Sequence, residues 1–448
     1  MPDLTLLPEG DLARFVTRQP WFRSRVGETV PARIAEAAVL EGTSPLLALA
    51  LVEIGVQNGG SELYQLPLGL RPAAEARRGG AIAEVDGWVA YDALADPELH
   101  DALVRHLTGG GVIRTADAAA VEYVATNVST TPPEPGRQSF VLKAYRRLEA
   151  GTHPELELLR FLNDRGFANA PVLGGWYSYA SRLICATLGV VHVRIDAAAD
   201  GWTFARESLT EDPQLFLAEA GRLGAVVGAM HAVLASERGD PDFAPEEPSA
   251  EALALLGATL DEEVGSLFAT LPDDDALAPI AGCCEEVREN LRLLSRLGVA
   301  GRVIRLHGNL HLGTVVRAGG DWLLLDFGGE TERTIAERRR KQSPLRDVAS
   351  MLRSFAYVVS AATLDGADPP RDWEEQARAE FLAGYFGEIE PTGLIPGGMA
   401  ASEKLLTLFE LERAVHELRF ELEHRPEWVP IPVAAVARLL ELQVATVS

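Results

Sequence analysis

The polar residues Asn309 and Asp326 have the types and the spacing of a phosphoryl-transfer site. They lie in the segment 304–330, where a β-rich run precedes the polar turn HGNLH and a second run, DWLLLDF, follows a pair of glycines. Polar side chains at the ends of strands can converge. Phosphoryl transfer needs one residue that orients the attacking hydroxyl group and a carboxylate that holds Mg²⁺ against the phosphates. We assign these two roles to Asn309 and Asp326.

This segment resembles the catalytic and metal-binding segments of kinases with the aminoglycoside-phosphotransferase-like fold, which read HGDxHxxN/Q and, after a strand, D-F/I-E/D. Its continuation, ERRRKQSPLRDVASMLRSFAY, is similar to the corresponding part of the maltokinase and actinobacterial glucosamine kinase family. The resemblance extends over nearly the whole chain. It implies a kinase that uses ATP and Mg²⁺ to phosphorylate a small sugar such as maltose or glucosamine.

The chain departs from this family at two positions that matter for catalysis. Asn309 stands where the family has its catalytic Asp, and Thr314 stands where it has a metal-binding Gln. An asparagine can orient a hydroxyl group but cannot take its proton, and the loss of a general base typically costs about 10²–10⁴-fold in rate. The short Thr314 side chain would leave Asp326 to hold the metal almost alone. His311 is assigned to the same catalytic turn (residues 307–311), where a histidine in this fold hydrogen-bonds the loop.

Lys143 and Glu157 fit the nucleotide-binding lobe of a kinase. In kinases a Lys on a strand pairs with the phosphates, and a Glu on the following helix holds that Lys. Lys143 lies in the predicted strand SFVLKAY and Glu157 in the predicted helix after it. Either residue alone is more simply an exposed surface residue, so the assignment depends on their order. The other predicted nucleotide contacts are Asn127 and Ser129 in the phosphate loop and, near the adenine, His192 with the backbone of residues 188–192.

Acidic residues near the C-terminus fall on one face of a predicted helix. Glu410, Glu417 and Glu421 have helical spacing, and the simpler explanation is that they pair with nearby arginines. The segment AVHELRFELEHRPEW resembles the family's AVYEVxYExxxRPxW, which implies that this face lines a sugar pocket. The substrate contacts predicted on this basis are His307, Glu417, Glu421, Arg425 and, stacked against the sugar ring, Trp428.

Composition restricts the classes of function and partner. The 448 residues include 41 Lys and Arg against 65 Asp and Glu, and the formal net charge of −24 repels nucleic acid and anionic membranes. Three cysteines, without a CxxC pair, favour neither a disulfide framework nor a zinc site. The N-terminal segment lacks the pattern of an export signal, and the apolar runs are too short to span a bilayer. We expect a globular, cytoplasmic protein without nucleic-acid or membrane partners.

The order of predicted strands and helices favours an α+β protein with a bilobal, protein-kinase-like fold. Residues 1–80 are predicted to form an N-terminal cap of mixed sheet and helix, whose YQLPL run resembles the cap of the maltokinase family. Residues 81–190 are predicted to form the nucleotide-binding lobe. Residues 191–448 are predicted to form a mostly helical lobe with the catalytic turn and the sugar pocket. His231, on a long amphipathic helix of that lobe, is expected to be buried.

Two functions are open at this point. The first is an ATP-dependent sugar kinase whose chemistry is adapted to Asn309. The second is a pseudokinase that keeps nucleotide or sugar binding and acts as a regulatory partner of an active kinase relative or of an enzyme of trehalose or glycogen metabolism. Lys143, Glu157 and Asp326 favour nucleotide binding under both hypotheses. The changes at Asn309 and Thr314 favour the second.

Overall fold

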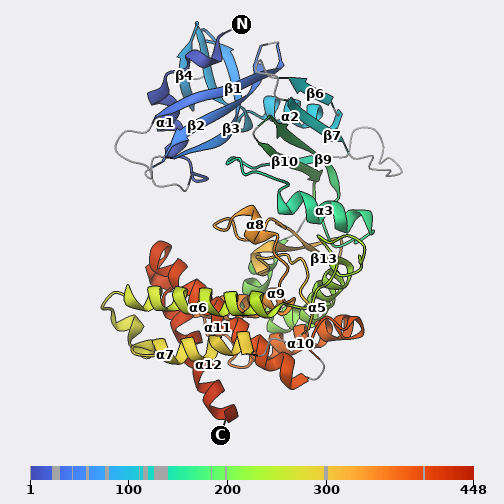
Figure 1. Ribbon diagram of the computed structural model, residues 1–448, viewed down its shortest axis with the longest axis vertical. Coiled ribbons are helices and arrows are strands. Elements are labelled where there is room, and N and C mark those ends of the chain that lie inside the picture. The colour runs from blue at the N-terminus through green and yellow to red at the C-terminus, as the bar shows by residue number, and fades with distance from the viewer. Residues whose placement is uncertain are drawn as a thin grey trace. The chain divides into compact units, whose positions relative to one another are not determined.

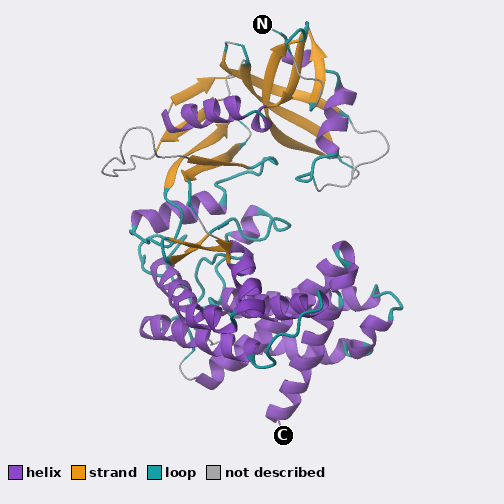
Figure 2. Ribbon diagram, turned by 180° about the vertical axis from the view of Figure 1, so that it is seen from behind, coloured by secondary structure: helices purple, strands orange, loops and turns teal. Residues whose placement is uncertain are grey.

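The chain divides into two compact units. Unit 1 comprises Met1–Arg160 and Pro171–Ile195, and unit 2 comprises Phe161–Ala170 and Asp196–Ser448. Unit 1 holds two five-stranded sheets, whereas helices dominate unit 2 (Figure 2). The computed structural model describes residues 2–22, 31–42, 44–56, 60–75, 80–109, 111–114, 120–125, 140–182, 184–196, 199–296, 301–396 and 399–447.

The first sheet of unit 1 is antiparallel, with the strand order β1-β2-β3-β5-β4 (Figure 1). Leu12 and Val16 of helix α1 (Glu9–Thr17) pack in the core on one of its faces. The pairing of β3 with β5 carries the sheet past residue 80, where we predicted the end of the cap. The strands are β1 (Ala32–Glu41), β2 (Leu46–Gly55), β3 (Ser61–Pro72), β4 (Ala81–Val85) and β5 (Trp88–Asp92).

The second sheet has the order β6-β7-β9-β10-β8 and shares a core with the first. Leu47, Leu49 and Leu51 of β2 face this shared core, together with apolar residues of α2 and of β9 and β10. Strand β2 is thus covered on both faces, which explains its nearly continuous apolar sequence. The further elements of unit 1 are α2 (Pro97–Gly109), β6 (Gly111–Arg114), β7 (Ala120–Ala125), β8 (Phe140–Ala144), β9 (Leu173–Ala180) and β10 (Cys185–Val193). Helix α3 (Pro154–Asp164) begins in unit 1 and ends in unit 2.

Unit 2 contains a three-stranded sheet surrounded by helices. Gly319 and Gly320 form the two-residue turn between β12 and β13, and both have the positive φ that a type I′ turn requires. The strands are β11 (Ala199–Asp200), β12 (Val315–Ala318) and β13 (Asp321–Leu324). The helices are α4 (Gly201–Glu211), α5 (Pro213–Leu234), α6 (Ala250–Ala269), α7 (Cys284–Arg296), α8 (Ile335–Arg338), α9 (Leu345–Leu364), α10 (Trp373–Ile389), α11 (Met399–His424) and α12 (Pro430–Val447).

Helices α5 and α10 pack with their backbones in close approach. A Cβ atom at Gly224 would lie 1.9 Å from the carbonyl oxygen of Phe381, and one at Gly384 would lie 1.9 Å from that of Gly221. Only glycine fits these positions. Within the described residues, α5 alone has the length and hydropathy that a membrane span needs, but half of its most apolar window is buried inside the protein, as in a core helix.

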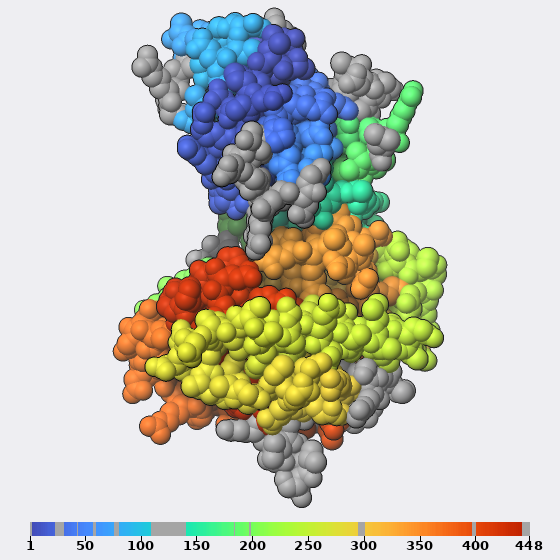
Figure 3. Space-filling model, turned by 60° about the vertical axis from the view of Figure 1, so that its left-hand side comes forward, coloured from blue at the N-terminus to red at the C-terminus, as the bar shows by residue number. Residues whose placement is uncertain are grey.

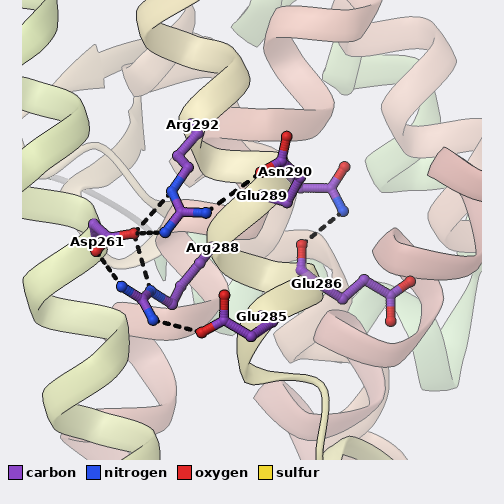
Figure 4. Close-up of polar contacts among 7 residues, drawn as sticks. All are labelled: Asp261, Glu285, Glu286, Arg288, Glu289, Asn290 and Arg292. Carbon is purple, nitrogen blue, oxygen red and sulfur yellow. Dashed lines mark hydrogen bonds and ion pairs between the residues drawn. The ribbon is translucent and has the colours of Figure 1, made fainter.

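Helices α6 and α7 form a hairpin that lies across one face of unit 2, in yellow in Figure 3. Asp261 of α6 accepts hydrogen bonds from Arg288 and Arg292 of α7 (Figure 4). Arg288 and Arg292 also pair with glutamates of their own helix. The hairpin is therefore tied by ion pairs at its surface.

Candidate functional site

The catalytic turn begins with two backbone N–H groups that donate to one buried carboxylate. Asp347, in the first turn of α9, accepts from the N–H groups of His307 and Gly308 at 2.9 Å each. It is 2% exposed and lies 3.1 Å from Nε2 of His231, a fully buried residue of α5. Burial acts to raise the pKa of Asp347, but His231, His307 and the backbone hydrogen bonds hold it below its ordinary value. An ionised carboxylate thus anchors the turn to α9 and α5.

The imidazole of His307 links this turn to the segment that precedes Asp326. Its Nδ1 accepts from the N–H of Asn309 at 3.4 Å, and its Nε2 donates to the carbonyl oxygen of Leu325 at 2.6 Å. The ring is therefore held between the two segments by both of its nitrogen atoms. His307 is 1% exposed, so our prediction of a substrate contact is corrected to a supporting role.

Asn309 and Asp326 consequently belong to two segments that one histidine joins. Asn309 is half-buried and Asp326 is exposed. Asp326 has a φ of 60°, a left-handed backbone conformation that residues other than glycine seldom adopt. Such strain persists only where the surrounding structure imposes it, and it gathers at functional sites. The structure thus links, through His307, the two segments that carry the residues we singled out from the sequence.

His311 and Thr314 cap the short 3₁₀ helix η4 (Leu312–Thr314). Nδ1 of His311 accepts from the N–H of Gly313 at 3.0 Å, and the Thr314 hydroxyl group donates to the carbonyl oxygen of His311 at 2.8 Å. The same hydroxyl oxygen accepts from the N–H of His311 at 3.0 Å. These reciprocal bonds form a capping box. Burial and the nearby Arg413 lower the pKa of His311 to about 4, so its ring is neutral at pH 7.

The predicted metal role of Thr314 is contradicted by the capping hydrogen bonds of its hydroxyl group. Thr314 is 4% exposed, and its hydroxyl group is used by the backbone of the turn. Glu330 is also engaged, because it pairs with Arg333 at 2.6 Å and with Arg413. Within the described residues there is no group of three or more His, Cys, Asp and Glu placed to hold a metal. Mg²⁺ binds in kinases through one or two carboxylates, phosphate oxygens and water, so the exposed Asp326 fits such an ion.

In unit 1, Lys143 lies on β8 and forms an ion pair with Glu155 at 2.9 Å. The Tyr145 hydroxyl group donates to the same carboxylate at 2.9 Å, and its ring stacks on His153 with the centroids 3.7 Å apart. Our sequence interpretation named Glu157, the other glutamate in the first turn of α3. The buried position of Glu155, which no motif indicated, identifies it as a partner of Lys143. A role of Glu157 beside it stays a prediction.

The backbone that we predicted to contact adenine belongs to a strand in the middle of the second sheet. β10 lies between β8 and β9, and its backbone from Gly189 to His192 pairs with both neighbours. The sheet therefore uses these backbone groups, and an adenine contact of this backbone stays a prediction. Nδ1 of His192 lies 3.0 Å from the carbonyl oxygen of Val193, and an adenine contact of this ring stays a prediction. Asn127 and Ser129 lie outside the described residues.

Gln65 is a supporting residue that sequence reasoning missed, although it lies in the YQLPL run. Its side-chain amide donates to the carbonyl oxygens of Tyr145, at 2.7 Å, and of Leu188, and it accepts from the Tyr177 hydroxyl group at 2.7 Å. Gln65 is fully buried on β3. Tyr145 in turn contacts Glu155, so a residue of the first sheet supports the strand that carries Lys143.

Arginine and tyrosine partners occupy the acidic face of α11. Arg353 of α9, 1% exposed, donates to Glu417 from Nε at 3.0 Å and from Nη2 at 2.8 Å. Glu421, also 1% exposed, accepts from Arg425 at 2.8 Å and from the Tyr357 hydroxyl group at 3.1 Å. The simpler explanation, pairing with arginines, is therefore the one that the structure shows. It corrects the prediction that the Glu421 carboxylate faces a sugar directly.

Trp428 follows α11 in the chain and is not fully buried. It lies in the short helix η6 (Pro426–Trp428) and is half-buried, as is Arg425, whose guanidinium carbon lies 4.6 Å from its ring centroid. Tyr357 stacks beside it, with the centroids 6.2 Å apart, and Trp202 lies at 6.4 Å. The predicted residues Arg425 and Trp428 thus belong to one aromatic and cationic cluster.

Comparisons with known proteins agree with this architecture. The family model of the maltokinase N-terminal cap domain matches residues 15–96. The chain is 28% identical to a glucosamine kinase of Mycolicibacterium smegmatis over 313 residues, which are 67% of this chain and 75% of that protein. It is 26% identical to a glucosamine kinase of Streptacidiphilus jiangxiensis over 304 residues, 64% of this chain and 65% of that protein.

Solved structures show the fold. A glucosamine kinase in complex with glucosamine, ADP and inorganic phosphate has a TM-score of 0.68 and 22% identity, over 92% of this chain and 96% of that one. A second crystal structure of a glucosamine kinase has a TM-score of 0.67 and 21% identity, over 96% and 99%. The α+β kinase-like prediction is confirmed. Residues 15–96 of this chain thus match a maltokinase N-terminal cap domain, and the chain has the kinase-like fold of the glucosamine kinases.

Proposed function

We propose that this chain is an ATP- and Mg²⁺-dependent sugar kinase, which phosphorylates a hydroxyl group of a small sugar such as glucosamine or maltose. The observation that carries the proposal is the His307 link, which joins the Asn309 turn to the segment that ends at Asp326. The relatives that the chain matches are glucosamine kinases, and this favours a catalytic function over a regulatory pseudokinase.

In this proposal Asn309 orients the acceptor hydroxyl group. The transition state of phosphoryl transfer is loose, so positioning and charge stabilisation contribute more than proton abstraction. The side-chain oxygen of Asn309 accepts a hydrogen bond from the sugar, while its amide cannot take the proton. Asp347 and His307 hold the backbone of the turn, so the amide is presented from a rigid support. We expect a working but slow enzyme.

We assign phosphate binding to Lys143 of unit 1 and metal binding to Asp326 of unit 2. Lys143 would bind phosphate oxygens, as its Glu155-paired position on β8 suits, and Asp326 would bind Mg²⁺. The metal supplies neutralisation of the charge on the phosphates. Arg425 and Trp428 would bind the sugar, with Trp428 stacked against its ring.

Release of ADP tests the proposal directly. The purified protein is assayed with ATP and Mg²⁺ against glucosamine, maltose, glucose and trehalose. We expect release that depends on one of these sugars and is abolished by Asp326→Ala, while the exposed Asp321→Ala on β13 serves as the matched control. Nucleotide binding without sugar-dependent release would instead support the pseudokinase.

The variant Asn309→Asp measures how much the side-chain amide of Asn309 lowers the catalytic rate. It restores a proton acceptor on an unchanged turn, so we expect kcat to rise by about two orders of magnitude, the lower end of the roughly 10²–10⁴-fold attributed to such groups. An unchanged or lower kcat would mean that the wild-type chemistry is adapted to asparagine.

A further inference from the structure

A cavity in unit 2 lies beside the catalytic turn. Gly308 and Gly329 form part of its wall. Their φ angles are 79° and 70°, and a Cβ atom at Gly308 would lie 3.4 Å from the Cα atom of Gly329. Because neither residue has a side chain, the cavity reaches the backbone next to Asn309 and the backbone three residues after Asp326.

Arginines dominate the lining of this cavity. They are Arg333, Arg338, Arg340, Arg346 and Arg413, and they face three glutamates and Asp347. Asp347 is already committed to the catalytic turn and to His231. The cavity is thus a positively charged place in a chain whose net charge is −24.

The carboxylates that line the cavity neutralise only part of the positive charge of its arginines. Glu330 pairs with Arg333 and Arg413, and Glu412 pairs with Arg346 at 2.8 Å. Arg340 is exposed and forms no salt bridge within the part of the chain that the structure describes. A guanidinium group has five N–H donors in a planar fork, so an arginine with one carboxylate partner keeps donors for a further oxyanion.

Ser350 supplies an independent observation. It lies on α9, lines the cavity and is 8% exposed. Its buried hydroxyl oxygen has no hydrogen-bond partner among the described residues. Buried polar groups are normally satisfied, because leaving one unsatisfied is destabilising. An oxygen atom of a ligand in the cavity would satisfy it.

We propose that this cavity binds an oxyanion, the phosphate or carboxylate group of a small ligand, between its guanidinium groups and the Ser350 hydroxyl group. Arginine forks match the geometry of both groups, and the glycine wall admits them to the edge of the catalytic turn. The oxyanion comes either from a phosphorylated sugar or from a sugar acid. The proposal concerns binding and holds whether or not the chain is a kinase.

Thermal unfolding without nucleotide tests it. The probes are inorganic phosphate, glucose 6-phosphate, glucuronate and uncharged glucose, each at one ionic strength set with chloride. A ligand that binds only the folded protein raises Tm. We expect inorganic phosphate and one of the two acidic sugars to raise it, and glucose not to. The comparison of glucose 6-phosphate with glucuronate distinguishes the two sources.

Variants locate the site by titration calorimetry with the ligand that gives the larger shift. We expect Arg340→Gln and Ser350→Ala each to weaken binding by about tenfold, as the loss of a charge-assisted hydrogen bond implies. Arg302→Gln, an exposed arginine of the same unit that does not line the cavity, is the matched control and should leave Kd unchanged.

Three results would overturn the proposal. One is an equal effect of chloride, which would indicate general ionic stabilisation. Another is equal weakening by Arg302→Gln and Arg340→Gln. The third is loss of binding in Lys143→Ala, which would place the anion at the predicted nucleotide site. None of them bears on sugar-dependent ADP release, so the proposed function is tested separately.

Discussion

Two aspartates of unit 2 each gather several donors, yet they differ in burial. Asp347 is 2% exposed and holds two backbone N–H groups of the catalytic turn as well as His231. Asp261 holds Arg288 and Arg292 across the α6–α7 hairpin (Figure 4), and its side chain is 27% exposed. Water and salt compete for the contacts of Asp261 but not for those of Asp347. Burial, rather than the number of contacts, therefore distinguishes the acid that positions the turn.

The same distinction separates supporting from ligand-binding candidates in unit 1. The Lys143 side chain is 37% exposed, whereas its partner Glu155 is 5% exposed and Gln65 is fully buried. A residue that meets a ligand must reach solvent, while the residues that orient it gain strength from a dry environment. The comparison predicts that substitution of a buried supporting residue lowers the unfolding free energy strongly. Substitution within an exposed ion pair should lower it only slightly.

The largest effect is expected for Asp347→Ala. It leaves the buried His231, the buried N–H group of His307 and the part-buried N–H group of Gly308 without their acceptor, and breaking a buried pair by removing one partner costs about 3–5 kcal/mol. Urea unfolding measures the loss, and sugar-dependent ADP release should fall with it. Asp347→Asn, which keeps one acceptor oxygen, should lose less. Equal and small losses in both variants would contradict a central role of this carboxylate.

The second largest effect is expected for Gln65→Leu. It removes the partner of two carbonyl oxygens and of the Tyr177 hydroxyl group, which at about 1–3 kcal/mol for a buried unsatisfied group predicts a clear loss of unfolding free energy. Because Tyr145 connects this site to Glu155, we also expect the KM for ATP to rise severalfold while the KM for the sugar stays constant. Gln19→Leu is the control, since within the described residues its side-chain amide bonds only to the carbonyl oxygen of Phe15, near the end of α1. A rise of both KM values would indicate general damage.

The supporting residues also show which features the sequence predicted and which it did not. Alternating apolar residues and glycine turns are local signals, so β1, β2, β3 and the β12–β13 hairpin were predictable. Asn309 and Asp326 followed from a motif. The roles of His307 and Thr314 were wrong because residue type does not show whether a polar group faces a ligand or its own loop. Glu155 and Glu157 share one helical turn, and the sequence did not indicate that Glu155 pairs with Lys143.

The boundary at residue 80 failed for a different reason. β3 pairs with β5, so the first sheet continues through a segment that reads, by itself, as the start of the next domain. Strand pairing of this kind depends on contacts distant in sequence, and periodicity does not report it. The buried acceptors Asp347 and Gln65 were likewise visible only as residues of family-like motifs.

Substitution of His311 is expected to change the unfolding free energy by a smaller amount, and this change depends on pH. Its pKa is lowered to about 4 in the folded protein, against about 6.5 in an unfolded chain. The unfolded state therefore binds the proton more tightly, so the stabilisation is complete above pH 6.5 and is lost as the pH falls toward 4. We expect His311→Asn to flatten the pH dependence of the unfolding free energy between pH 7 and 5 by about 1–2 kcal/mol. Parallel curves for wild type and variant would assign the pH dependence to other groups.

The smallest effect is expected for Asp261→Asn, which tests the exposed half of the comparison. The hydrogen bond from Arg288 is the main cause that lowers the pKa of Asp261, so its ion pairs are formed at neutral pH. Exposed pairs are nevertheless worth little at physiological salt, because water replaces them and ions screen them. We expect the thermal midpoint at about 0.15 M salt to match the wild type, with a small difference appearing only at low salt. If Asp261→Asn lowers the midpoint as much as Asp347→Asn, then the number of donors, and not burial, decides which aspartate supports the fold.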